Sequence, residues 1–109
     1  MNLAQKKCLP CEGGTLPLKG AAAEKYLKEL GGDWSVLDGA KIRKEFVFEN
    51  FREALAFVNR AGRIAESEGH HPDIHLVSYK KVIIELSTHA VGGLSENDFI
   101  LAAKIDAIK

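Results

Sequence analysis

The amino-acid sequence predicts an α+β domain of two layers, in which an antiparallel sheet is covered by helices. Segments with helical spacing of apolar residues alternate with pairs of short strand-like segments, so the predicted order is helix, hairpin, helix, hairpin, helix. The two strands of each pair are contiguous in the sequence and are joined by a short turn. This arrangement favours antiparallel pairing over a parallel sheet, in which single strands alternate with helices.

The size and composition of the chain are those of one globular domain. It has 109 residues, of which 46% are hydrophobic and 28% are charged, so we expect a single domain over residues 1–109. Fifteen basic residues balance fifteen acidic ones, which leaves no net field to attract a nucleic acid directly. Apolar runs such as Val82–Ile84 are far shorter than the roughly 20 residues that span a bilayer, and the N-terminus lacks an apolar signal region. We therefore expect a cytoplasmic protein without membrane contact.

The N-terminal part of the chain predicts an irregular arm followed by a helix. Residues 1–18 contain both cysteines and two of the three prolines, and they show neither helical nor strand periodicity. From Lys19 to Leu30 the apolar residues recur at helical spacing, and Gly31-Gly32 provides a helix stop.

The next segment predicts a hairpin. Residues 34–37 and 40–48 flank Asp38-Gly39, a dipeptide that favours a two-residue hairpin turn. One face of the hairpin is expected to be buried, because three apolar residues share one parity: Ile42, Phe46 and Phe48. Lys44 has the same parity and must lie at an edge or extend its ammonium group to the surface.

Residues 51–68 predict the longest helix. Asn50 followed by Glu53 resembles a capping box, and Gly69 with Pro72 provides the stop. Apolar residues step along this segment at intervals of three and four: Phe51, Ala54, Leu55, Val58, Ala61 and Ala65.

A second hairpin and a third helix complete the prediction. Strands are expected at residues 74–78 and 81–89, the latter with one apolar face and with His89 on the opposite face. Ser95 is a predicted N-cap with Asp98 three residues later. The apolar stripe of the helix follows: Leu101, Ile105 and Ile108.

The two cysteines, Cys8 and Cys11, have the spacing of half a zinc site or of a redox dithiol. A structural zinc site needs four ligands, and no second cysteine pair exists. A thioredoxin-like pair belongs at a strand-to-helix junction, whereas these residues lie in the arm. Two reduced cysteines in the cytosol are the favoured interpretation.

Four histidines fall within twenty residues: His70, His71, His75 and His89. Imidazole can move protons near neutral pH and can also bind metal ions. The His-Glu-x-x-His spacing of metalloproteases is absent. From the residues alone, ordinary surface or core groups, metal ligands and acid/base catalysts all remain possible.

The segment from Glu66 to Asp98 resembles the signature of the pterin-4a-carbinolamine dehydratases. The residues that carry the resemblance stand at fixed spacing: Glu66, His70-His71-Pro72, Tyr79, His89 and Asp98. The sequences of residues 86–89 and 93–98 are similar to the family, and so are the arm around Cys8 and Cys11, the pattern of Leu27, Leu30 and Trp34, and the total length. The resemblance therefore covers nearly the whole chain and points to the bacterial members.

The resemblance implies a four-stranded antiparallel sheet with helices on one face. It also implies an activity: a lyase, 4a-hydroxytetrahydrobiopterin dehydratase, which removes water from 4a-hydroxytetrahydropterin to give quinonoid dihydropterin. This step recycles the pterin of an aromatic amino acid hydroxylase, as in phenylalanine hydroxylation, and such a hydroxylase is a possible partner. No metal and no organic cofactor are implied. A homodimer or homotetramer is implied, with a helical seam and paired edge strands.

The resemblance also assigns residues. His70, His71 and His89 are the implied catalytic residues; we expect His70 and His89 to move protons and His71 to bind and orient the pterin. Glu66 could orient an imidazole. We expect Pro72 to turn the chain, and Ser87 and Thr88 to offer polar groups to the pterin.

The remaining signature residues are expected to be structural, with Tyr79 in packing and Asp98 as the first-turn cap of the third helix. Trp34 either stacks near the site or belongs to the core, and His75 is expected to be an ordinary strand residue. Gly69 and Asn97 stand where animal members carry an acidic residue and an arginine, so substrate contacts from these positions are not carried over.

Two other functions remain as alternatives. Animal relatives also act as a dimerisation cofactor for a homeodomain transcription factor, so a regulatory protein-binding module is one of them. A metal-dependent hydrolase that uses the histidines as ligands is the other.

Overall fold

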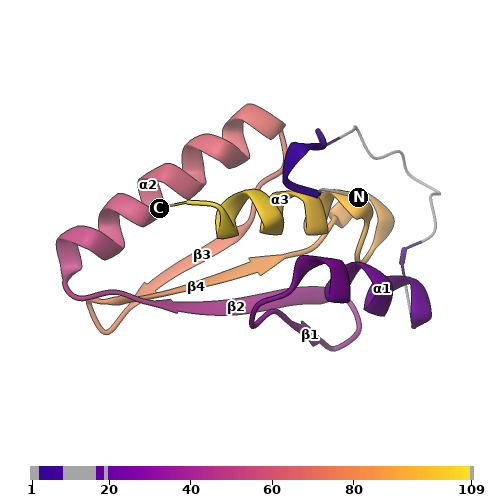
Figure 1. Ribbon diagram of the computed structural model, residues 1–109, viewed down its shortest axis with the longest axis horizontal. Coiled ribbons are helices and arrows are strands. Elements are labelled where there is room, and N and C mark those ends of the chain that lie inside the picture. Colours follow the sequence, from indigo (N-terminus) through magenta and orange to yellow (C-terminus); the bar gives the residue numbers. More distant parts are fainter. Residues whose placement is uncertain (1–2, 9–16, 19, 109) are drawn as a thin grey trace.

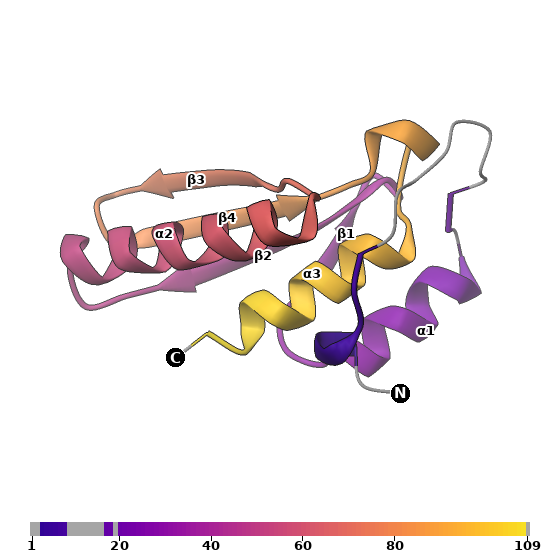
Figure 2. The same ribbon diagram turned by 90° about the horizontal axis from the view of Figure 1, so that it is seen from above.

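The computed structural model describes residues 3–8, 17–18 and 20–108. It contains a four-stranded antiparallel sheet in the order β1-β2-β4-β3, built from Ser35–Leu37 (β1), Lys41–Val47 (β2), Asp73–Val77 (β3) and Lys81–Leu86 (β4). Three helices accompany it, Ala21–Leu30 (α1), Phe51–Glu68 (α2) and Glu96–Asp106 (α3), with short 3-10 helices at Leu3–Gln5 (η1) and His89–Val91 (η2). Figures 1 and 2 show the three helices on one face of the sheet. The predicted α+β class and its four-stranded sheet are confirmed.

The core lies between the sheet and the helices, where the predicted parity places it. Val82, Ile84 and Leu86 of β4 are fully buried, and they alternate with partly exposed residues that face away from the helices. From the helical side, Phe99, Leu101 and Ile105 of α3 are also fully buried. Burial of this apolar surface is the main stabilising contribution to a domain of this size.

The helix ends follow the predicted signals. Asn50 caps α2 by accepting the Glu53 N–H at 2.9 Å, and Gly69 ends the helix in the left-handed conformation with φ 67°. Ser95 and Asp98 form the predicted capping box of α3. No helix among the described residues is both long and apolar enough to cross a membrane.

Three local predictions were wrong. Both hairpin loops have three residues, Asp38 to Ala40 and Ser78 to Lys80, because Leu37 pairs with Lys41 and Val77 pairs with Lys81. The strand predicted to run to His89 ends at Leu86. Its partner β2 begins at Lys41, and Leu86 already pairs with Ile42, so β4 has little left to pair with beyond that point. Thr88 instead exchanges backbone hydrogen bonds with Gly93 at 2.7 and 3.3 Å. His89 therefore lies in η2 rather than on a strand face.

The sequence suggested a packing role for Tyr79, and this prediction is wrong. Tyr79 lies in the β3–β4 loop with φ 55°, and 60% of its surface is exposed. The loop projects beyond the end of the sheet, so the ring has Lys80 beside it, with Nζ 5.8 Å from the ring centroid, rather than core residues.

The N-terminal arm is more ordered than predicted where the structure describes it. Leu3 is 4% exposed and joins the core, and η1 packs on α3. Cys11 and the rest of residues 9–16 lie outside the described residues.

Asp106, in the last turn of α3, satisfies two polar groups from the sheet side. Its carboxylate accepts the Trp34 Nε1–H at 2.8 Å and pairs with Lys44 Nζ at 2.8 Å. The Lys44 ammonium lies 4.8 Å from the centre of the Phe46 ring. Lys44 therefore lies on the apolar face of β2, as predicted, and its ammonium group extends to a carboxylate at the edge of the core.

Replacement of Asp106 tests this arrangement. Asp106→Ala should lower the free energy of unfolding by about 2–3 kcal/mol, because it leaves both the indole N–H and the ammonium group without their acceptor. Urea unfolding followed by Trp34 fluorescence measures the change. Asp33→Ala, at an exposed position in the loop between α1 and β1, is the control and should have little effect on the free energy of unfolding. Equal stability of the two variants would contradict a structural role for Asp106.

Candidate active site

Three of the four histidines meet at one pocket of about 520 Å³. The residues that line it come from the end of α2, the chain after β4 and the start of α3, with one from the N-terminus: Cys8, Glu68, Gly69, His70, His71, Ser87, Thr88, His89, Ala90 and Asn97. A larger apolar pocket of about 780 Å³ lies between α2, β2 and α3, and no histidine lines it. The concentration of imidazoles makes the smaller pocket the candidate active site.

The register of the sheet explains why these residues meet. Strands β3 and β4 are antiparallel neighbours, and Asp73 at the start of β3 pairs with Glu85 near the end of β4. The residues just before β3 and just after β4 must therefore lie at the same end of the sheet. His70 and His71 precede Asp73, and His89 follows Leu86. Residues that are almost twenty positions apart in sequence are brought together by one hairpin.

Gly69 sets the direction in which the chain leaves α2. Its left-handed conformation closes the helix with a hydrogen bond to Glu66 O at 3.2 Å, and His70 N still reaches Ala65 O at 3.2 Å. Pro72 lies between the histidine pair and the first residue of β3, and it is partly buried. The two histidines thus occupy a short, constrained link between a helix and a strand, which limits where their rings can go.

His70 is held by a buried carboxylate. Its Nε2 lies 2.6 Å from Asp98 Oδ1, and the side chains of the two residues are 11% and 0% exposed. The other oxygen of Asp98 accepts the Thr88 hydroxyl and the Ser95 N–H, each at 2.9 Å. A carboxylate supplied with donors in this way selects a histidine tautomer with Nε2 protonated, which leaves Nδ1 as the free proton acceptor.

His71 has a different carboxylate partner. Its Nε2 lies 2.8 Å from Glu66 Oε1, but the two side chains are 65% and 80% exposed. The imidazole that Glu66 contacts is therefore that of His71. Because both groups are in water, this contact restrains the His71 ring less than Asp98 restrains His70.

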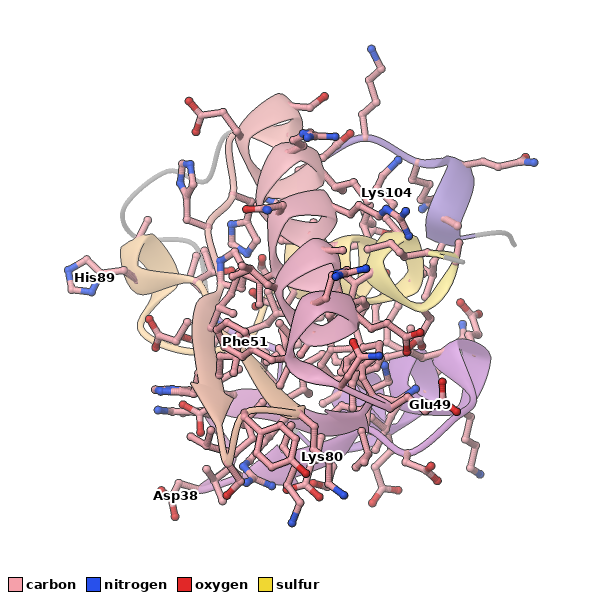
Figure 3. The ribbon with its side chains drawn as sticks, turned by 90° about the vertical axis from the view of Figure 1, so that its left-hand side faces the viewer. Asp38, Glu49, Phe51, Lys80, His89 and Lys104 are labelled. Atoms are coloured by element: carbon pink, nitrogen blue, oxygen red, sulfur yellow. The ribbon has the colours of Figure 1, made fainter. Side chains whose placement is uncertain are left out.

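His89 is the least constrained of the three. It begins η2, and Figure 3 shows its ring projecting away from the body of the molecule. The ring is exposed and forms no hydrogen bond with any described residue. The pocket thus has one fixed imidazole, one tethered at the surface and one open to solvent.

The other predicted site residues divide between the pocket and the rest of the fold. Ser87 lines the pocket and is exposed, whereas Thr88 is buried with its hydroxyl 2.7 Å from Ser95 Oγ. Trp34 does not line the pocket; it is 5% exposed in the core and is bonded to Asp106. His75 lies on β3, where Nε2 is 3.7 Å from Glu85, and it is also outside the pocket.

Sequence reasoning missed two features of the site. Asp98 was interpreted as a cap alone, yet it also holds His70. Cys8 and Glu68 line the pocket, although neither belongs to the signature. The contact between His70 and Asp98 could have been suspected, because a histidine and a carboxylate of the same signature are candidates for a hydrogen bond. No sequence pattern indicated that residue 8 would lie beside the histidines.

Cys8 and Glu68 are joined at the wall of the pocket. The Cys8 N–H donates to Glu68 Oε1 at 2.8 Å, and Lys104 Nζ lies 3.6 Å from Glu68 Oε2. The hydrogen bond from Cys8 is the main cause that holds the pKa of Glu68 below its usual range. Burial, reinforced by the negative charge of Glu68, raises the pKa of the Cys8 thiol to about 12. The thiol is therefore protonated and uncharged at neutral pH.

No group of three or more His, Cys, Asp or Glu side chains that could hold a metal ion occurs within residues 3–8, 17–18 and 20–108. Each of the two bonded histidines has a carboxylate partner instead of a second imidazole.

Comparison with known proteins gives one consistent family. Residues 16–108 match the family model described as pterin 4 alpha carbinolamine dehydratase. A relative from Alkaliphilus metalliredigens is 50% identical over 105 residues, which are 96% of this chain and 94% of the relative. One from Rubrobacter xylanophilus is 48% identical over 107 residues, 98% of each chain. Both carry the provisional name pterin-4-alpha-carbinolamine dehydratase.

Solved structures agree with the fold. A protein from Brucella melitensis described as a transcriptional coactivator/pterin dehydratase has a TM-score of 0.76 at 33% identity, covering 84% of this chain and 96% of its own. A pterin dehydratase-like protein described as a RuBisCO assembly factor in the alpha-carboxysome has a TM-score of 0.60 at 24% identity, over 72% and 90% of the two chains. The second comparison shows a shared fold alone.

The lowered pKa of Glu68 leads to a test by pH. A carboxylate whose pKa is lower in the folded than in the unfolded state stabilises the fold above its ordinary value of 4.5, and this contribution is lost as the pH falls through the lower, folded value. Glu68→Gln should therefore be less stable than the wild type at pH 7, and the difference should shrink below about pH 4.5.

Urea unfolding at pH 7, 5, 4 and 3 measures this difference, with Glu24→Gln on exposed α1 surface as the control for loss of one charge. A difference between wild type and Glu68→Gln that stays constant from pH 7 to pH 3 would contradict the Cys8–Glu68 contact.

Proposed function

We propose, from the premise that this chain belongs to the pterin-4-alpha-carbinolamine dehydratase family, that it converts 4a-hydroxytetrahydropterin into quinonoid dihydropterin and water. The observation that supports this reaction is that His70, His71 and His89 all line one pocket, with the ring of His70 held by buried Asp98. The pocket volume of about 520 Å³ is within the range of sites that take small molecules.

The proposed reaction requires two proton movements. The bond between carbon 4a and the hydroxyl oxygen breaks, and that oxygen takes a proton from a general acid and leaves as water. A ring nitrogen next to carbon 4a loses its proton to a general base, and its electron pair forms the new C=N bond. Each proton transfer by a positioned side chain typically contributes about 10²- to 10⁴-fold in rate. Side chains of this chain supply both groups, so the proposal invokes no metal and no organic cofactor.

We assign His70 and His89 to proton transfer and His71 to binding and orientation of the pterin. His70 suits a proton-transfer role because its ring is held in position and one ring nitrogen stays free of Asp98. His89 lines the pocket and is exposed, so it can exchange its proton with solvent between turnovers. Ser87 and the backbone at Thr88 are proposed to meet the amide edge of the pterin, while Glu66 orients His71 and Pro72 directs the histidine pair.

The proposed setting is pterin recycling after an aromatic amino acid hydroxylase, including phenylalanine hydroxylation, in the cytoplasm. A homodimer or homotetramer is also proposed. Exposed apolar residues support self-association, because Phe51 and Leu55 of α2 are 51% and 43% exposed.

Substitution of the histidines tests the assignment. His70→Ala and His89→Ala should each lower kcat by about 10²-fold or more, since each removes one proton-transfer group. His71→Ala should mainly raise KM. The rate of loss of 4a-hydroxytetrahydropterin, generated in a coupled hydroxylase assay and corrected for its spontaneous dehydration, measures these effects. His75→Ala is the matched control, because His75 is outside the pocket. Full activity in a His70→Ala/His89→Ala variant would refute histidine catalysis.

Asp98 is proposed as a positioning residue for His70. Asp98→Asn keeps the shape and one acceptor oxygen but can offer an N–H to His70, which favours the other tautomer. We expect kcat to fall by about 10²-fold with KM changed less than threefold. Ser95→Ala is the control: it removes a contact of the same α3 cap and should lower the melting temperature while kcat stays within about twofold. A kcat in Asp98→Asn equal to that of the wild type would show that Asp98 is only a helix cap.

A regulatory binding role is the second candidate, and one observation favours it. The Brucella melitensis structure is described as a transcriptional coactivator as well as a pterin dehydratase. If regulation were the main role, a partner captured by the wild type would also be captured by His70→Ala/His89→Ala. Substitution of Phe51 and Leu55 on α2 would then abolish capture and leave dehydration unchanged.

A further inference from the structure

The segment Leu3–Cys8, here termed the N-terminal strap, lies across α3 (Figure 2). Its last residue, Cys8, lines the histidine pocket. Leu3 inserts into the core, and Lys6 pairs with Glu96 of α3 at 2.6 Å. Lys104 of α3 donates to the Ala4 carbonyl at 3.0 Å. The strap is therefore attached to α3 along its length by apolar and polar contacts.

The last residue of the strap is attached to the pocket on two sides. Cys8 N–H donates to Glu68 at the end of α2, and Cys8 Sγ lies 3.6 Å from the Asn97 carbonyl at the start of α3. These two neighbours both line the pocket, as Cys8 does. Cys8 thus bridges the end of α2 and the start of α3 at the pocket.

Glu68 is the residue on which this attachment depends. Its side chain is 11% exposed, and its two oxygens serve Cys8 N and Lys104 Nζ. Lys104 also holds the strap at Ala4, so one carboxylate connects both ends of the strap to the helices. A charged, mostly buried carboxylate with two donors is a rigid anchor, because loss of these hydrogen bonds would leave a buried charge without partners, at a high cost in free energy.

The family match begins at residue 16, after the strap. The histidines and Asp98 lie inside the matched region, whereas Cys8 lies outside it and still lines the same pocket. The strap thus adds to the pocket a surface that the matched region does not supply. That surface is the uncharged thiol of Cys8, which suits contact with the flat face or edge of a neutral ring.

We propose that the N-terminal strap is a wall of the substrate pocket, that Cys8 contacts the reduced pterin and limits the space for it, and that Glu68 is the positioning residue that holds this wall in place. The inference rests on the proposed function, because the ligand is the pterin of that reaction.

Cys8→Leu tests the contact, because the larger leucine side chain fills part of the pocket that the thiol leaves open to the pterin. We expect the Kd for 7,8-dihydrobiopterin, measured by calorimetry, and the KM for the carbinolamine to rise about tenfold or more, with kcat within threefold. Cys8→Ser, of similar size, should retain both values within about threefold. Gln5→Leu is the matched control, since it adds the same side chain to an exposed position of the strap and should leave Kd and KM unchanged.

Glu68→Ala tests the anchor if Cys8→Leu does not fold. Loss of the acceptor of Cys8 N–H should raise Kd and KM about fivefold with little change in kcat, and Glu68→Gln, which retains an acceptor oxygen, should restore most of the affinity. A merely structural glutamate would lower the melting temperature in both variants without this rescue of KM.

The outcomes separate the two proposals. Wild-type protein that neither dehydrates the carbinolamine nor binds 7,8-dihydrobiopterin overturns the proposed function, and the wall with it. Active wild-type protein, together with folded Cys8→Leu or Glu68→Ala variants whose Kd and KM stay within twofold of it, overturns the wall alone.

Discussion

The buried carboxylate of Asp98 is the interaction on which the site depends. It is fully inaccessible, and a carboxylate in that position is tolerated only if hydrogen bonds replace its hydration. The replacements come from three parts of the fold: the Ser95 N–H at the start of α3, the Thr88 hydroxyl after β4, and the His70 ring after α2. One group thereby caps the start of α3, attaches the chain that leaves the sheet, and contacts an imidazole. A change that disturbs any of these contacts acts on the other two.

The sheet supplies the second constraint. Because β3 and β4 are adjacent and antiparallel, their register decides that the histidine pair and His89 share one end of the sheet. A shift of one residue in that register would turn Val82, Ile84 and Leu86 out of the core, so the same apolar residues that stabilise the fold also hold the site in register. Stability and site geometry are not independent here, since both depend on the alternation along β4.

The parts that could be predicted from sequence are those governed by local chemistry. Apolar periodicity, Asn50, Gly69 and the Ser95–Asp98 box specify helices and their ends from neighbouring residues, and they were predicted correctly. The end of β4 was not, because it depends on where β2 begins and on the distant Asp98 contact of Thr88. Cys8 and Glu68 are 60 residues apart and belong to no periodic pattern, so their contact could not be inferred. The histidine set was suggested by its resemblance to the family signature, but the partner of each ring became clear only from the three-dimensional arrangement.

The three imidazoles differ in a way that matches a two-proton reaction. A group that must stay aligned with the substrate benefits from a fixed ring, and His70 has one because both oxygens of its partner are occupied. A group that must be reprotonated after each turnover benefits from access to water, and His89 has it. If both rings were fixed and buried, proton exchange with solvent would need a further relay; if both were exposed, alignment would be lost to rotation. The unequal burial of the pair therefore suits the proposed acid/base dehydration better than equal burial would, and it follows from where α2 and β4 end and where β3 begins.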